Sequence, residues 1–214
     1  GPRGLRKGRR AMSMPSILKQ RLVQTALTIM LLGAGAASML PPGEPQPSEA
    51  VLLAMDIGAY YESSGRHIGT PYVDKVGKGQ PLTVCNGVTG PEVVAGRYYT
   101  KTDCMRLELP MYLAAEAAAK RMFRHWSTYN VWVQASLIDM IYNLGEAQVA
   151  GSTMRALANA GDLDGACAQM PKWVRGTVNG KSAVLAGLVD RRGTTAELCS
   201  SWGRDGHFMA GVLP

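Results

Sequence analysis

The hydrophobic pattern of the main body begins after a proline-rich stretch. Ser48 is a suitable N-cap residue, with Glu49 in the first turn of the helix that it would open. Apolar side chains then recur with helical spacing, at Val51, Leu52, Met55 and Ala59. Ser63-Ser64-Gly65 breaks the pattern, so we expect this helix to end near Glu62.

Residues 66–100 have few helical signals and are rich in Gly, Thr, Val, Tyr and Pro. Leu82–Cys85 and Arg97–Thr100 are typical of short strands, and Gly87–Gly90 is typical of a turn. The helical period returns after Pro110. The expected helices are Met111–Trp126, Val131–Leu144, Ser152–Ala160, Leu163–Met170 and Val184–Cys199, with Gly145, Gly161 and Gly180 between them. One helix, a small antiparallel sheet and a helical bundle give an α+β fold with the sheet near one end.

Residues 22–40, ahead of this body, carry no charged side chain. Nineteen helical residues would measure about 28 Å, close to the thickness of the bilayer's hydrocarbon core. Basic residues precede the segment, so the N-terminus should stay in the cytoplasm and the body should lie outside. The segment therefore predicts attachment to a bacterial inner membrane.

This segment is only weakly apolar, and several interpretations stay open. It fits a permanent anchor, or a cleaved signal peptide with Ala34-Gly35-Ala36 as its small-residue site. It also fits a signal anchor that inserts and later leaves the bilayer, or a buried helix of a soluble protein. We favour a signal anchor that later leaves the bilayer, because a segment with so few large apolar side chains would bind the bilayer only weakly.

Charge and proline content divide the chain into four parts. Residues 1–21 form a basic tail. We expect the native chain to start at Met12 or Met14 and not at Gly1-Pro2. The apolar segment 22–40, a proline-rich linker 41–48 and the main domain 49–214 follow. Of the 23 Lys and Arg residues seven lie in the tail, which leaves 16 against 16 acidic residues in the rest. The body therefore does not have the charge of a nucleic-acid-binding domain.

The chain has four cysteines: Cys85, Cys104, Cys167 and Cys199. Their even number suits two disulfides in an exported domain, whereas four reduced thiols would suit a cytosolic one. Three pairings are possible and the sequence does not choose among them; Cys85–Cys104 with Cys167–Cys199 is our guess. The wide spacings do not fit a zinc ribbon, and no glycine motif for nucleotides is present, so we expect no metal and no cofactor.

Two acids and a hydroxyl follow the first helix of the body. Glycoside hydrolysis requires a proton donor at the leaving oxygen and a second carboxylate. Glu62, at a helix C-terminus that disfavours negative charge, suits the donor. Asp74 could direct a water molecule, and Thr83 could orient that water. Acids at such spacing are common, however, so by themselves they are more typical of solvated surface carboxylates than of a catalytic site.

The sequence around these residues resembles the phage-type lysozymes (endolysins, muramidases). The resemblance rests on Tyr61-Glu62, on Pro71-Tyr72-Val73-Asp74 and on Leu82-Thr83-Val84-Cys85-Asn86-Gly87-Val88-Thr89-Gly90. It continues in Tyr142-Asn143-Leu144-Gly145 and Gly187-Leu188-Val189-Asp190-Arg191-Arg192. The weakly apolar N-terminal segment resembles that of the signal-arrest-release endolysins of this family.

The resemblance implies a lysozyme-like fold, in which a small β-lobe and a larger helical lobe border a cleft. It implies that Glu62 is the catalytic acid, Asp74 the second carboxylate and Thr83 the third member of the triad. The implied substrate is peptidoglycan, cut between N-acetylmuramic acid and N-acetylglucosamine. The chain departs from the family pattern in the longer spacing of these three residues, and in having Asn86 and Val88 where relatives often carry Tyr and His.

Other polar residues are weaker candidates. Asn86 and Asn143 could contact the sugar, although Asn143 could equally serve helix packing. Arg191 and Arg192 could bind an anionic part of the substrate, but we expect them to brace the last helix against acidic neighbours. We expect His67, His125 and His207 to be structural or on the surface, and Trp126, Trp132 and Trp173 to belong to the core.

These features predict a monomeric endolysin, held at the inner membrane facing the periplasm and soluble there after release. Two other classes of function remain. A lytic transglycosylase also uses a Glu acid but forms an anhydro sugar without water, so the mass of the released muropeptides would identify it. A membrane-tethered, non-enzymatic peptidoglycan-binding module would bind cell walls without clearing them.

Overall fold

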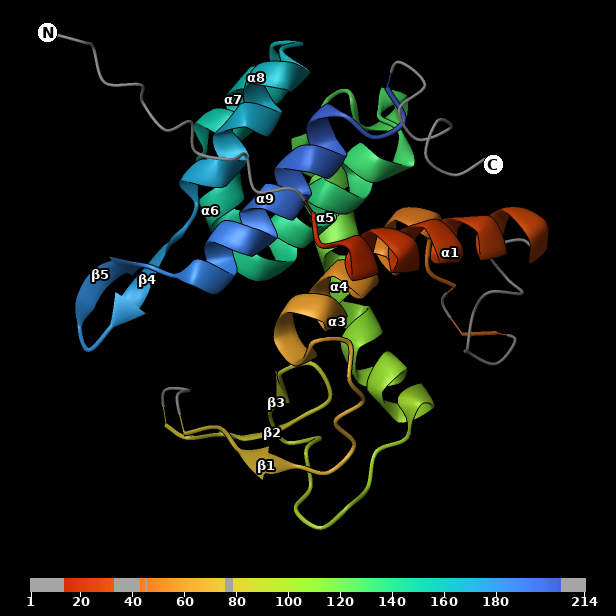
Figure 1. Ribbon diagram of the computed structural model, residues 1–214, viewed down its shortest axis with the longest axis vertical. Coiled ribbons are helices and arrows are strands. Elements are labelled where there is room, and N and C mark those ends of the chain that lie inside the picture. The colour runs from red at the N-terminus through yellow and green to blue at the C-terminus, as the bar shows by residue number, and fades with distance from the viewer. Residues whose placement is uncertain (1–13, 33–42, 45, 76–78, 205–214) are drawn as a thin grey trace, which may run out of the picture.

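The computed structural model describes residues 14–32, 43–44, 46–75 and 79–204. The first half holds α1 (Ser16–Leu32), α3 (Glu49–Ser63), β1 (Tyr72–Val73), β2 (Leu82–Val84), β3 (Val88–Thr89) and α4 (Lys101–Met122). The second half holds η1 (Trp126–Thr128), α5 (Val131–Leu144), α6 (Glu146–Ala150), α7 (Thr153–Asn159), α8 (Leu163–Gln169), η2 (Met170–Lys172), β4 (Arg175–Val178), β5 (Lys181–Val184) and α9 (Ala186–Ser200). Figure 1 shows β1–β3 at one end of the molecule and the helices at the other, with α4 extending between them.

The small sheet is antiparallel in the order β1-β2-β3. Thr83 in the middle strand pairs with Tyr72 on one side and with Thr89 on the other. The strand expected at Leu82–Cys85 is confirmed up to Val84, but the turn expected at Gly87–Gly90 is wrong because Val88–Thr89 forms β3. The chain turns earlier, where Cys85 and Gly87 have φ angles of 58° and 84°.

The strand expected at Arg97–Thr100 is also wrong. Tyr99 is buried there as a tertiary anchor, since its hydroxyl donates to the Glu92 carbonyl and accepts from the Val94 N–H. Thr100 then opens α4 through a capping box with Asp103. This helix begins well before the expected start, and it accommodates Pro110 on its exposed side.

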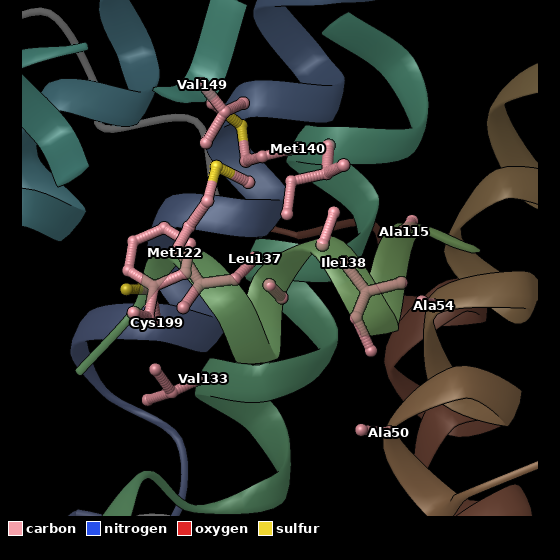
Figure 2. Packing of buried hydrophobic residues seen from close by; sticks show 14 of the residues in the cluster. Ala50, Ala54, Ala115, Met122, Val133, Leu137, Ile138, Met140, Val149 and Cys199 are labelled. Atoms are coloured by element: carbon pink, nitrogen blue, oxygen red, sulfur yellow. The ribbon is translucent and has the colours of Figure 1, made fainter. Parts of the chain in front are cut away.

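The core of the helical part lies between α3, α4, α5 and α9. Figure 2 shows Ala54 of α3 close to Ala115 of α4 and Ile138 of α5, where small side chains allow the helices to pack closely. The helix expected at Val131–Leu144 is confirmed, and those expected at Ser152–Ala160 and Leu163–Met170 are confirmed to within one residue at each end. This agreement follows from strong apolar periodicity.

The structure adds a β-hairpin that the sequence analysis missed. Strands β4 and β5 pair from Arg175↔Val184 to Val178↔Lys181, so α9 begins at Ala186 and not at Val184. Asn179 and Gly180 form the turn with φ angles of 49° and 76°, the backbone that an Asn-Gly hairpin turn requires. The hairpin projects from the helices beside the start of α9 (Figure 1).

The N-terminal helix α1 packs against the body, mainly on α3. Its buried residues recur along one face, at Leu18, Leu22, Ala26 and Ile29. Helix α1 runs through residue 21, where the basic tail was placed to end. No helix in the described residues is long and apolar enough to cross a membrane. Residues 33–40 of the expected anchor, and residues 1–13 of the tail, lie outside the described part of the chain.

Polar contacts also fix α1. The backbone N–H of Met14 donates to Glu197 Oε2 at 2.7 Å, and Lys19 lies 3.4 Å from Oε1 of the same carboxylate. The Thr25 hydroxyl donates to Asp56 Oδ2 on α3 at 2.5 Å. Burial raises the pKa of Asp56 to about 6, although the Thr25 hydroxyl and the Arg21 charge act in the opposite direction. The buried Asp56 carboxylate beneath α1 therefore lowers the stability of the folded protein near neutral pH.

Replacement of Asp56 by Asn is expected to stabilise the protein near pH 7. The folded-state pKa lies above the ordinary value of 3.8, so this group makes the fold less stable as the pH rises from about 4 through 6. A pKa change of this size corresponds to about 3 kcal/mol of unfolding free energy. Urea unfolding at pH 4 and pH 7 measures it: the variant should gain over the wild type only at the higher pH. An equal difference at both values would contradict the role of Asp56.

Candidate active site

Glu62 lies in the last turn of α3, where that helix meets the loop to the sheet. Ser64 ends the helix in a left-handed conformation with φ 55°, and the N–H groups of Ser64 and Gly65 donate back to the Ala59 carbonyl. The Glu62 side chain is 35 % exposed. The predicted position of Glu62 at a helix C-terminus is therefore confirmed.

A buried arginine holds the Glu62 carboxylate. Arg191 of α9 donates from Nη1 to Glu62 Oε1 at 2.6 Å and from Nη2 to Asp139 Oδ1 of α5 at 2.7 Å. Asp139 is fully buried and Arg191 is 3 % exposed. Burial by itself would lower the pKa of Arg191, but the Asp139 and Glu62 carboxylates raise it overall. The guanidinium is thus a fixed positive charge beside Glu62.

The next arginine continues this network. Arg192 is fully buried, lies 3.6 Å from Asp139 Oδ2 and donates to Asn143 Oδ1. Burial lowers the pKa of Arg192. The two arginines therefore brace α9 against an acidic partner, as expected from sequence, but the partner Asp139 was missed. Its signal was a single acid in an otherwise apolar helix pattern.

A cleft of about 770 Å³ opens beside Glu62 between the sheet and the helices. It is lined by Glu62, Asn86, Gly87, Val88, Thr89, Glu92, Arg106, Leu107, Pro110, Met111, Tyr142 and Asn143. Glu62 Oε2 reaches the turn of the sheet, 3.9 Å from the position that a Cβ on Gly87 would take. Three of the predicted site residues, Glu62, Asn86 and Asn143, thus border one cavity.

The two predicted partners of Glu62 lie on the sheet and do not line this cavity. Asp74 directly follows β1, and its N–H donates to the Pro81 carbonyl across the strand pair at 3.0 Å. Thr83 is 2 % exposed, and its hydroxyl donates to the same carbonyl at 3.1 Å. Thr83 pairs with the cleft residue Thr89. Because side chains alternate along a strand, Asp74 and Thr83 share one face of the sheet with Thr89.

Asn86 and Asn143 differ in whether their side-chain polar atoms are available to a ligand in the cleft. The side-chain amide of Asn86 is bonded inside the protein: its Nδ2 donates to Glu108, and its Oδ1 accepts from the Ser63 hydroxyl. Asn143 accepts a bond from Arg192, while among the described residues its own NH₂ group has no hydrogen-bond partner and can donate into the cleft. The ring of Tyr142 stacks on that of Tyr112, with 4.0 Å between the ring centroids, and adds an aromatic surface to the cleft. The sequence analysis did not assign Tyr142 to the site.

Two disulfides tie loops to helices. Cys85 in the turn after β2 is bonded to Cys104 of α4, and Cys167 of α8 is bonded to Cys199 of α9. This is the pairing guessed above. Glu108 lies beside the first bridge, but sulfur atoms engaged in a disulfide are not thiolate ligands, so this group is no metal site.

Comparisons with known proteins agree with this geometry. The phage lysozyme family model matches residues 66–195, which include Asp74 and Thr83 and begin just after Glu62. The SAR-endolysin of Enterobacteria phage P21 is 34 % identical over 136 residues, which cover 63 % of this chain and 75 % of that protein. The SAR-endolysin of Escherichia phage Mu is 34 % identical over 144 residues, covering 62 % and 81 %.

Solved structures show the same fold. The endolysin from Escherichia coli O157:H7 phage FAHEc1 matches with a TM-score of 0.62 and 22 % identity, over 74 % of this chain and 96 % of that one. The active form of the P1 phage endolysin Lyz matches with a TM-score of 0.58 and 19 % identity, over 82 % and 92 %. Family model, relatives and fold together show that the chain belongs to the phage lysozyme family of glycoside hydrolases, in its SAR-endolysin subgroup.

Proposed function

We propose that this protein hydrolyses the β-1,4 bond between N-acetylmuramic acid and N-acetylglucosamine in peptidoglycan and thereby lyses the host cell. The observation that carries the proposal is the position of Glu62, a partly exposed carboxyl group in the wall of the cleft between the sheet and the helices. A glycan strand would lie in this cleft. Glu62 then donates a proton to the glycosidic oxygen, which leaves with one sugar.

Asp74 and Thr83 complete the proposed reaction. Asp74 accepts a proton from a water molecule as that water attacks the sugar carbon, and Thr83 orients the water through its hydroxyl. Their placement on one face of the sheet supports a joint role. In this role the Thr83 hydroxyl exchanges its bond to the Pro81 carbonyl for a bond to the water.

Arg191 has a defined part in the proton cycle. Once Glu62 has given up its proton, the carboxylate that remains is stabilised by the guanidinium 2.6 Å away. Asp139 fixes that guanidinium from the buried side, so Arg191 stays in place while Glu62 changes its charge. The arrangement favours return of Glu62 to the same position before each turnover.

The products test the reaction type. The purified full chain is incubated with peptidoglycan, and the released muropeptides are weighed by mass spectrometry. Hydrolysis gives a reducing N-acetylmuramic acid end that contains the elements of water. Anhydro-muramyl products would show a transglycosylase, and cell-wall binding without soluble products would show a binding module; either result rejects the proposal.

We also propose that residues 22–40 hold the new protein at the inner membrane until it is released into the periplasm. The SAR-endolysin subgroup supports this. So does α1, which exposes Ile17, Met30, Leu31 and Leu32 as well as burying an apolar face on the body. Fractionation of producing cells before and after an uncoupler tests the idea. Protein that stays with the membrane throughout would refute release.

A further inference from the structure

Glu108 of α4 is a buried carboxylate close to the cleft but outside the predicted triad. The residue is 5 % exposed. Its Oε1 accepts the backbone N–H and the side-chain Nδ2 of Asn86, both at 3.0 Å, and its Oε2 accepts Nδ2 as well, also at 3.0 Å. Burial raises the pKa of Glu108, whereas these Asn86 bonds lower it. A buried acid that binds one residue so completely fixes that residue's position.

Asn86 passes this constraint to the end of α3. Its Oδ1 accepts the hydroxyl of Ser63 at 2.6 Å, and Ser63 directly follows Glu62. Gly87, directly after Asn86, is the residue that Glu62 Oε2 approaches. Glu62 is therefore linked to Asn86 through the backbone of α3, and its carboxylate also lies beside the turn of the sheet that holds Asn86.

We propose that Glu108 is a positioning residue for Glu62, acting through Asn86 and Ser63. The inference rests on the proposed function, since it concerns the acid of that reaction. Glu108 sets the orientation of the Asn86 amide, and the amide joins α3 to the sheet at the cleft wall. A displacement of a catalytic group by about 1 Å can lower a rate by about a hundredfold, so this link controls turnover and not only folding.

Replacement of Glu108 by Gln tests the proposal. The Gln side chain offers one acceptor and one donor, so its NH₂ would face the NH₂ of Asn86 and the amide would turn away. We expect kcat on soluble peptidoglycan fragments to fall at least tenfold, with KM changed by less than about twofold. Near-UV circular dichroism and a melting curve select an assay temperature at which the variant is folded.

A swapped pair provides the matched control. In the double variant Glu108→Gln/Asn86→Asp, the Gln amide can donate to the new carboxylate, which still accepts from Ser63. We expect kcat to return to within about threefold of the wild type. A third variant, Ser63→Ala, removes the bonds of the Ser63 hydroxyl to Asn86 and to the Ala59 carbonyl within α3, and it leaves Glu108 paired with Asn86; it should lower kcat as well.

The outcomes separate this inference from the proposed function. A wild-type protein that releases no hydrolysis products contradicts the function itself. With an active wild type, a folded Glu108→Gln variant of undiminished kcat overturns the positioning role, and so does a folded double variant no better than the single one. Should Glu108→Gln fail to fold, an unchanged kcat in Ser63→Ala overturns the proposal instead.

Discussion

Replacement of Glu62 by Gln is expected to lower cell-wall hydrolysis by about 10²–10⁴-fold, the contribution typical of a general acid. The amide has the shape of the carboxyl group and its oxygen can still accept from Arg191, so the fold should be retained. It has no proton acidic enough for the leaving oxygen. Turbidity loss of permeabilised Gram-negative cells measures the effect, and a melting curve checks the fold.

Glu92 is the matched control, because it is a second carboxylate that lines the same cleft. Glu92→Gln removes the same charge from the same cavity but not the proposed proton donor, so its activity should stay within about tenfold of the wild type. Equal losses in the two variants would mean that the charge of the cleft, and not a proton from Glu62, determines the rate. Full activity of Glu62→Gln would remove the assignment altogether.

Replacement of Asp139 by Asn is expected to cost about 3–5 kcal/mol of unfolding free energy. The change leaves the shape of the side chain almost intact but removes the fully buried counterion that Arg191 and Arg192 share. A buried charge whose partner has been removed carries the penalty of desolvation without compensation. Chemical denaturation at neutral pH measures the difference.

An exposed ion pair gives the comparison for this effect. Asp164, whose side chain is 80 % exposed, pairs with Arg204 at the surface. Asp164→Asn should cost no more than about 1 kcal/mol, as is usual for surface pairs. If Asp139→Asn were as mild as this control, the buried network could not be what fixes α9 against α5.

The elements that the sequence predicted are those with local signals. The N-cap at Ser48 and the break after Ser63 placed α3, and thus Glu62, within a residue of its position. Apolar periodicity did the same for α5. The sheet and the hairpin were harder, because strands of two to four residues are too short for a period to show. The signal at β4–β5 was the Asn179-Gly180 pair, but the sequence analysis considered only Gly180, as a break between two helices.

The site was predictable only in part, for a different reason. The groups that surround Glu62 come from distant parts of the chain: Arg191 binds a carboxylate 52 positions away, and Glu108 binds a residue 22 positions away. A pattern along the sequence does not show such partners. For α1, residues spaced as Leu18, Leu22 and Ala26 are compatible with a bilayer and with a protein core, so composition alone did not choose between them.

The two disulfides give the protein a different stability in each compartment. Each closes a short loop, of 19 and 32 residues in sequence separation, for which about 3–4 kcal/mol of stabilisation is typical. In a reducing cytosol neither disulfide would form, neither the one beside the Asn86 turn nor the one between α8 and α9. If the chain is exported as proposed, it would gain the stability that the two disulfides provide only outside the cytosol. Copies that are still in the cytosol would lack both disulfides and would be the less stable form of the enzyme.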